Sequence, residues 1–286
     1  MKRRPGGRWW LAAAAALLAA AVITHVTASA AQNPSATGSS GRPETNATAA
    51  TRHRIWIPNP PTTWQWQLTT PVNQSVKAKM FDIDLFDNSA AVVASLHRRG
   101  VHVICYLDAG TYENFRPDAG RFPRSVLGAT NGWPGERWLD IRQLRVLAPI
   151  MLARFTQCKA KHFDGVEADN VDGYSNHTGF PLTAADQLTY NRWLARTAHR
   201  LGLSIALKND TDQAAQLEPD FDYALDEQCF QYSECSKLRP FVRAHKAVFE
   251  VEYNLPTSRF CPQARADGFM SMRKRLNLGA MRQTCW

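Results

Sequence analysis

Short apolar or alternating runs recur along the chain after about residue 54, and most of them follow a stretch with helical spacing. The eight runs lie at residues 63–68, 81–87, 101–110, 163–170, 203–210, 223–230, 247–254 and 278–284. Strands that alternate with helices form parallel sheets, and eight strand–helix units are the number that closes a barrel. We therefore expect an α/β fold, a (β/α)₈ TIM barrel in a single domain, with a doubly wound open sheet as the alternative.

The clearest helical signal lies between the fourth and fifth runs. Thr183 and Asp186 have the spacing of a capping box, several apolar side chains fall on one stripe, and Gly202 ends the segment. Residues 69–80, between the first two runs, show no clear amphipathic pattern. The first crossover of the barrel is therefore expected to be irregular.

The first thirty residues have the organisation of a secretory signal peptide. A basic head precedes an apolar stretch, and the small residues Ala28, Ser29 and Ala30 form a cleavage pattern. A retained anchor is the alternative, because the apolar stretch is near the lower length limit for crossing a bilayer. Residues 31–53 are small and polar and predict a flexible linker, which leaves residues 54–286 as the folded domain. We expect a secreted, extracellular protein without a stable membrane anchor.

Six cysteines in an exported chain predict three disulfides. Sequence alone does not choose among the possible pairings, but proximity along the predicted elements favours one set. The expected pairs are Cys105–Cys158, Cys229–Cys235 and Cys261–Cys285. A zinc site is the alternative, and it is disfavoured because no Cys/His cluster has the spacing of a structural zinc site.

The chain is basic, with a formal net charge of +9. Removing the four basic residues of the predicted signal peptide lowers this charge to +5. Most lysines and arginines stand singly on predicted helices, without the combined basic and aromatic surface that indicates nucleic-acid binding. We expect a solvated basic exterior, no nucleic-acid partner and a monomer.

Acidic residues gather where the fourth and sixth runs end. The segment FDGVEADNVDGY, residues 163–174, contains four acids. Because side chains alternate along a strand, Glu167 and Asp169 share the face that points into the barrel, with Asp169 at the carboxyl-terminal mouth. The same alternation places Glu227 on the inner face of the sixth strand. Asp169 and Glu227 are therefore expected to face each other across the mouth.

Two carboxyl groups that flank a bond are the chemistry of glycoside hydrolysis, in which one protonates the leaving oxygen and the other attacks or activates water. Lys208 is expected one strand along from Asp169. A lysine in this position would keep that carboxyl ionised. Aromatic residues near the strand ends could stack on sugar rings.

The succession of runs resembles the endo-α-1,4-polygalactosaminidase family of glycoside hydrolases over roughly residues 55–255. The segments that carry the resemblance are TWQWQL, DIDLFD, VICYLDAG, WLDIR, FDGVEADNVDGY, LSIALKND, DEQCF and FEVEY. The resemblance implies a secreted (β/α)₈ enzyme that cleaves α-1,4-linked galactosamine polymers, with a mechanism similar to that of the α-galactosidases. We expect no cofactor and no metal.

The resemblance also implies roles for individual residues. Asp169 would be the nucleophile and Glu227 the general acid/base of a retaining reaction. The further residues expected to bind substrate are Trp66, Asp84, Tyr106, Glu167, Asp172, Lys208, Glu252 and Tyr253. Carboxyl groups would then outnumber the single lysine at the mouth, which suits a cationic, deacetylated galactosamine chain. An N-acetylated or neutral galactan remains an alternative.

Two other functions use the same fold. A metal-dependent phosphodiesterase is suggested by the segments HRRG at residues 97–100 and EAD at residues 167–169. It is disfavoured because His97 is expected at a helix end rather than at a strand mouth. A carbohydrate-binding barrel without catalysis is disfavoured because binding alone does not require carboxyl groups at the ends of both the fourth and sixth strands.

Overall fold

The computed structural model describes residues 55–286 of the 286-residue chain. The predicted signal peptide, residues 1–30, and the predicted linker, residues 31–53, lie outside the described residues. Within the described part of the chain, no helix combines the length and apolar character needed to cross a bilayer.

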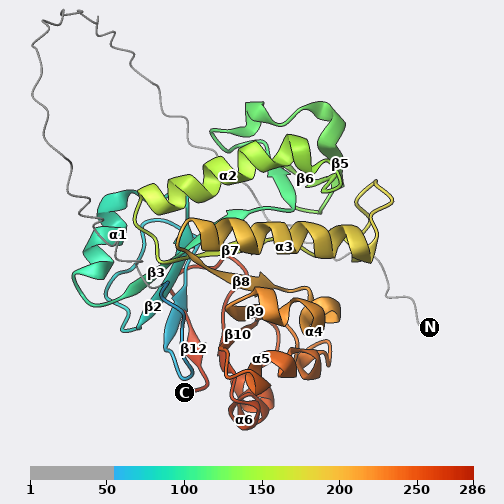
Figure 1. The fold of residues 1–286 in the computed structure, drawn as a ribbon. Coiled ribbons are helices and arrows are strands. Elements are labelled where there is room, and N and C mark those ends of the chain that lie inside the picture. Colours follow the sequence, from blue (N-terminus) through green and yellow to red (C-terminus); the bar gives the residue numbers. More distant parts are fainter. Residues whose placement is uncertain (1–54) are drawn as a thin grey trace, which may run out of the picture. The chain divides into compact units, whose positions relative to one another are not determined.

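A curled, mostly parallel sheet of nine strands forms the centre of the fold (Figure 1). The eight parallel strands are β1 (Trp64–Trp66), β2 (Met80–Asp84), β3 (His102–Asp108), β7 (Gly165–Asp169), β8 (Ser204–Lys208), β9 (Tyr223–Glu227), β10 (Val248–Glu252) and β11 (Met270–Arg273). They are neighbours in chain order, and the short β12 (Gln283–Thr284) pairs antiparallel with β11. This arrangement is consistent with the expected (β/α)₈ fold.

Helices cover the outside of the sheet. They are α1 (Ala90–His97), α2 (Leu144–Ala160), α3 (Ala184–Arg200), α4 (Ala214–Leu217), α5 (Arg239–Arg243) and α6 (Thr257–Asp267). Short 3₁₀ turns occur at Ala119–Arg121, Arg124–Val126, Gly173–Ser175, Thr211–Gln213, Glu218–Asp220 and Cys235–Leu238. The two long helices, α2 and α3, lie side by side along one flank of the sheet (Figure 1).

Two local predictions are confirmed. Thr183 precedes α3 and forms the expected capping box, because its hydroxyl accepts the N–H of Asp186 while the Asp186 carboxylate accepts the N–H of Thr183. The connection between β1 and β2, residues 67–79, contains no helix, as the missing amphipathic pattern predicts.

The predicted position of the eighth strand, residues 278–284, is wrong. The eighth parallel strand is β11, and only residues 283–284 of the predicted segment form a strand, which runs antiparallel. The αL conformation of Gly268, with φ 75°, ends α6 and leads directly into β11. Met270 and Met272 then point into the barrel. With only two apolar side chains on its inner face, this strand gives a weak sequence signal.

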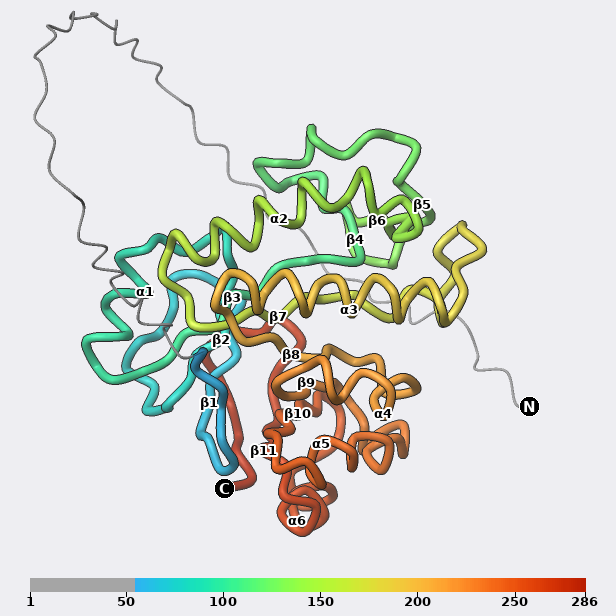
Figure 2. The backbone as a smooth tube through the Cα atoms, viewed as in Figure 1, coloured from blue at the N-terminus to red at the C-terminus, as the bar shows by residue number. Residues whose placement is uncertain are grey.

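A small antiparallel sheet is inserted between β3 and α2, and the sequence patterns did not predict it. It contains β4 (Thr111–Glu113), β5 (Leu127–Thr130) and β6 (Glu136–Leu139), in the order β4-β6-β5. Figure 2 shows this insertion beyond α2, away from β1 and α6. Because it follows the end of β3, it begins at the carboxyl-terminal edge of the barrel strands.

Two separate hydrophobic clusters show which side chains face inward. The outer cluster lies between strands and helices and contains Val166 and Val248. The inner cluster contains Trp64, Phe249 and Val251, and the ring centroids of Trp64 and Phe249 are 4.9 Å apart. Since side chains alternate along a strand, the apolar residues of these clusters show whether each polar residue of the same strand points into the barrel or toward the helices.

The three disulfides expected from the sequence are present. They are Cys105–Cys158, Cys229–Cys235 and Cys261–Cys285, and no free cysteine remains among the described residues. The first ties β3 to α2, the second closes the loop after β9, and the third fastens α6 to the C-terminal segment. The zinc alternative is thereby excluded for these cysteines.

Candidate active site

A buried lysine brings three carboxyl groups together at the ends of β7, β8 and β9. The Lys208 Nζ atom lies 2.9 Å from Glu167 Oε1, 2.9 Å from Asp169 Oδ1 and 3.2 Å from Glu227 Oε2. Burial alone would lower the pKa of Lys208, but attraction to Asp169, Glu167 and Glu227 raises it well above its usual value. The lysine is therefore a permanent cation, and the predicted pair Asp169 and Glu227 meets at it.

Asp169 is held in its ionised form. Its Oδ2 accepts a hydrogen bond from the Tyr106 hydroxyl at 2.8 Å, and its Oδ1 accepts the N–H of Asn170 at 2.8 Å. Burial raises the pKa of this carboxyl, but the charge of Lys208 and these hydrogen bonds outweigh burial and bring the pKa below its usual value. A carboxylate that stays ionised, with 16% of its side chain exposed, can act as a nucleophile.

Glu227 is the more exposed of the two, with 24% of its side chain accessible. Its Oε2 accepts from Asn209 Nδ2 at 3.1 Å, and its Oε1 accepts from the Tyr253 hydroxyl. Because Lys208 Nζ contacts both Asp169 Oδ1 and Glu227 Oε2, these oxygens are no farther apart than the sum of the two distances, about 6.1 Å. The two carboxyl groups can thus flank one bond of a substrate.

Glu167 lies beneath Asp169 on the inner face of β7 and is fully buried. Burial raises its pKa, and Lys208 opposes that effect. Asp82 of β2 lies beside it, and burial together with the charge of Glu167 raises the pKa of Asp82 well above its usual value. Glu167 therefore acts on the site through Lys208, since its side chain cannot reach solvent.

Trp66 also lies below the lysine. Its ring centroid is 4.8 Å from Lys208 Nζ, and the side chain is 1% exposed. This position stabilises the ammonium by a cation–π contact and leaves no ring face for a sugar. Tyr106 and Tyr253, by contrast, direct their hydroxyl groups at Asp169 and Glu227.

Two other predicted substrate-binding residues, Asp84 and Asp172, lie outside the cluster at Lys208. Asp84, at the end of β2, forms an ion pair with Arg116 at 2.5 Å and is 2% exposed. Asp172 lies in the loop above β7, where partial burial and the charge of Asp169 raise its pKa to about 6. Asp84 is thus already paired within the protein, whereas Asp172 interacts with the charge of Asp169.

The structure corrects the predicted placement of Glu252. Phe249 and Val251 of β10 belong to the inner cluster, so Glu250 and Glu252 point outward. The fully buried Glu252 accepts the backbone N–H groups of Phe230 and Gln231 at 3.0 Å. Glu252 therefore fixes the loop that follows Glu227 and does not line the mouth.

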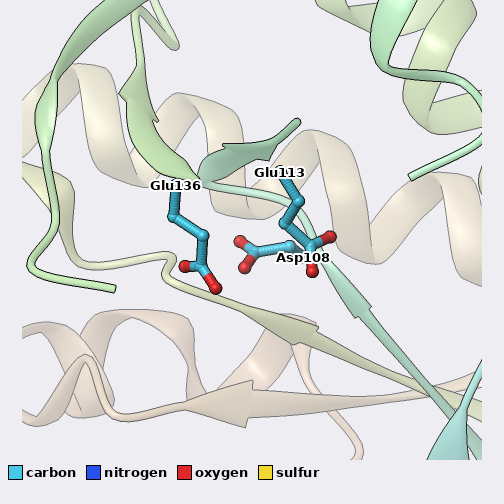
Figure 3. Close-up of side chains that lie close together, drawn as sticks. All are labelled: Asp108, Glu113 and Glu136. Carbon is cyan, nitrogen blue, oxygen red and sulfur yellow. The ribbon is translucent and has the colours of Figure 1, made fainter. Parts of the chain in front are cut away.

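A second acidic group lies between β3 and the inserted sheet, as Figure 3 shows for Asp108, Glu113 and Glu136. One oxygen from each lies within 4.8 Å of the others. Burial is the main cause that raises the pKa of Glu113 to about 7 and that of Glu136 to about 8. The three could offer oxygen ligands to a cation, but Arg116 Nε already lies 2.8 Å from Glu113 Oε1. This positive charge and the raised pKa values both oppose binding of a divalent ion.

Sequence patterns missed several polar residues around the site. Asn170 and Asn209 immediately follow Asp169 and Lys208, and both adopt positive φ, 60° and 57°. An asparagine directly after a strand-end acid or lysine was a signal that could have identified them, because asparagine tolerates this conformation. Arg116 could not have been found in this way, since it reaches Asp84 from the inserted segment.

Of the two segments that suggested a phosphodiesterase, the one that contains His97 lies at the opposite end of the barrel from the mouth. His97 Nε2 is 2.9 Å from Asp164 Oδ2, and Asp164 immediately precedes β7. Asp169 is the last residue of the same strand. His97 and the acids at the mouth are therefore separated by the length of β7 and do not form one metal site.

Comparison with known proteins identifies solved structures of similar fold. The crystal structure of Aspergillus fumigatus Ega3 in complex with galactosamine has a TM-score of 0.77 and 38% sequence identity, covering 81% of this chain and 98% of that one. The glycoside hydrolase domain of PelA from Pseudomonas aeruginosa has a TM-score of 0.61 and 13% identity, covering 79% and 98%. The second likeness shows the fold alone.

No curated protein matches the sequence significantly. Residues 45–286 match the sequence model of glycoside-hydrolase family GH114. Together with the identity to Ega3, this match confirms the expected family and shows that the protein is a glycosidase. The chain belongs to glycoside-hydrolase family GH114.

Proposed function

We propose that the protein is a secreted endo-α-1,4-polygalactosaminidase that acts as a monomer with retention of configuration. Asp169 is the nucleophile and Glu227 the general acid/base. The observation that carries this proposal is the shared contact with Lys208, which keeps Asp169 Oδ1 and Glu227 Oε2 no more than about 6.1 Å apart. Retaining glycosidases have carboxyl groups about 5–5.5 Å apart, whereas inverting ones need about 6.5–9.5 Å to accommodate a water molecule.

In the first step, a carboxylate oxygen of Asp169 attacks the anomeric carbon while Glu227 gives its proton to the glycosidic oxygen. The bond between the anomeric carbon and that oxygen breaks, and the oxygen keeps the electron pair. In the second step Glu227 removes a proton from water, which displaces Asp169 from the anomeric carbon. Lys208 and Tyr106 stabilise Asp169 when it leaves as a carboxylate.

The substrate class is supported by two features. Ega3, which shares 38% identity over most of the chain, was crystallised with galactosamine. Asp169 and Glu227 are partly exposed beside Lys208, and Asp172 lies near enough to interact with the charge of Asp169, so the local excess of acids favours a polymer that bears ammonium groups. The three disulfides support export to an oxidising compartment.

The proposal is tested with the variants Asp169→Asn and Glu227→Gln. Each should release no measurable oligosaccharide from polygalactosamine while its thermal unfolding stays close to that of the wild type. Proton NMR of the first products should show the α-anomer before mutarotation. Near-normal release of oligosaccharide by either variant would show that the replaced residue does not have its proposed role. A β-anomer as the first product would contradict retention.

A further inference from the structure

The residues that follow the three strand ends of the site share an unusual backbone conformation. Asn170, Asn209 and Gln228 come directly after Asp169, Lys208 and Glu227, and their φ angles are 60°, 57° and 65°. Residues other than glycine rarely adopt this left-handed region, which is retained where surrounding interactions hold it in place. In Asn209, the conformation turns the side chain toward the neighbouring strand β9.

The Asn209 carboxamide binds Glu227 at two points. Its Oδ1 accepts the backbone N–H of Glu227 at 2.9 Å, and its Nδ2 donates to Glu227 Oε2 at 3.1 Å. A backbone N–H can only donate, so the oxygen of the amide must face it. The NH₂ group must then face the carboxyl group, and the orientation of the amide is fixed by the main chain.

The two oxygens of Glu227 therefore have different surroundings. Oε2 faces Asn209 Nδ2 and the Lys208 ammonium, and both of these can only donate. Oε1 faces the hydroxyl of Tyr253, which can donate or accept. A proton on Oε2 would face Asn209 Nδ2 and the Lys208 ammonium, which cannot accept it. A proton on Oε1 leaves Oε2 free to accept from both of these donors and is compatible with the Tyr253 hydroxyl.

We propose that Asn209 is a positioning residue that, together with Lys208, confines the proton of the general acid Glu227 to Oε1. This inference rests on the proposed role of Glu227. During the first step the Oε1–H bond breaks, the proton passes to the glycosidic oxygen, and the electron pair of the O–H bond remains on the carboxylate. The second lone pair of Oε1 accepts from Tyr253 throughout, and Oε2 keeps its two donors.

Leaving groups of different basicity test this assignment. In a series of aryl α-galactosaminides from dinitrophenyl to phenyl, only the poorer leaving groups need a proton from Glu227. Asn209→Gly removes the amide but tolerates the left-handed backbone, and Asn209→Asp keeps the acceptor for the Glu227 N–H while removing the donor. General acid catalysis contributes ~10²–10⁴-fold, so both variants should lose ~10–100-fold in kcat/KM, which reports the first step alone, on phenyl glycosides.

On dinitrophenyl glycosides the loss in kcat/KM should be less than ~3-fold, because that leaving group departs without a proton. His162→Gly is the matched control, since His162 has φ 66° but is exposed and precedes β7 at the opposite end of the strand. Its rates should equal those of the wild type. An equal loss on both kinds of substrate, or no loss on either, would overturn the role of Asn209.

Glu227→Gln in the same series separates this inference from the function on which it rests. If Glu227→Gln shows the steep dependence on the leaving group and the Asn209 variants do not, the inference fails and the role of Glu227 stands. If Glu227→Gln shows no such dependence, Glu227 is not the general acid and both fail. The aryl substrates also keep the test independent of which polymer the enzyme cleaves.

Discussion

Replacing Lys208 with methionine should strongly destabilise the fold. The ammonium is fully buried and lies within 3.2 Å of three carboxyl groups. At an effective dielectric constant of about 20, each such contact is worth roughly 5 kcal/mol, and desolvation of the charged groups offsets much of it. Removing one partner of a buried ionic group costs about 3–5 kcal/mol, because the remaining charges are left unpaired.

For a domain of this size the lost stability corresponds to a fall in Tm of ~6–20 °C at neutral pH, at about 2–4 °C per kcal/mol. Lys159→Met is the matched control, because Lys159 is exposed on α2. Its Tm should stay within about 2 °C of the wild type, as expected for a surface substitution of this kind. Thermal unfolding followed by circular dichroism measures both variants.

The loss of Tm in Lys208→Met should depend on pH, whereas the loss from a packing defect would not. In the wild type, the lowered pKa of Asp169 gives stability that is present above the unfolded pKa of about 3.9 and is lost only as the pH falls through the folded value. Without Lys208, burial raises the pKa values of Asp169 and Glu167. As the pH falls, these carboxylates become protonated, and the destabilisation caused by their unpaired charges decreases. The Tm difference between Lys208→Met and the wild type should therefore shrink between pH 7 and pH 5. A loss below about 1 kcal/mol, or a difference that does not change with pH, would refute this reasoning.

Two further predictions concern the neighbours of the proposed catalytic pair. Tyr106→Phe removes a hydrogen bond to ionised Asp169, so the acidic limb of the kcat/KM profile should move to higher pH; an unmoved limb would show that the hydroxyl does not support the nucleophile. Glu252→Gln keeps one carbonyl acceptor for the N–H groups of Phe230 and Gln231, whereas Glu252→Ala leaves them unpaired. The alanine variant should lose about 1–3 kcal/mol in urea unfolding and the glutamine variant much less, and equal losses would contradict the proposed contact.

Much of the barrel and the position of the proposed catalytic pair could be predicted because both depend on short-range alternation. Val166 and Ala168 identify the outer face of β7, which places Glu167 and Asp169 inside. The same reasoning placed Glu227 on the inner face of the sixth strand, facing Asp169. These assignments needed only the pattern within each strand and the rule that parallel strands end at a common edge.

The placement of Glu252 failed because both faces of β10 are buried. Glu250 and Glu252 share a face, as the alternation predicts, but Phe249 and Val251 take the inner positions. That choice depends on packing against Trp64 across the barrel, far away in the sequence. A strand with acids on one face and large apolar residues on the other is ambiguous until its partners are known.

Local sequence patterns also did not predict the inserted sheet or the contact between its acidic residues. Glu113 and Glu136 are direct cross-strand partners in β4 and β6, and like charges in such positions are unfavourable. No propensity rule would pair them. Their contact follows from the turn of the chain after β3 and from the compensating charge of Arg116 beside Glu113.

Trapping the covalent intermediate tests the proposed mechanism most directly. A fluorinated α-galactosaminyl fluoride, which forms the glycosyl-enzyme faster than water removes it, should add one sugar mass to the wild-type protein. Peptide mapping by mass spectrometry should place that sugar on Asp169, and Asp169→Asn should remain unlabelled. A sugar found on another residue, or rapid turnover of the fluoride without any adduct and with inverted product, would contradict the assignment of Asp169 as the nucleophile.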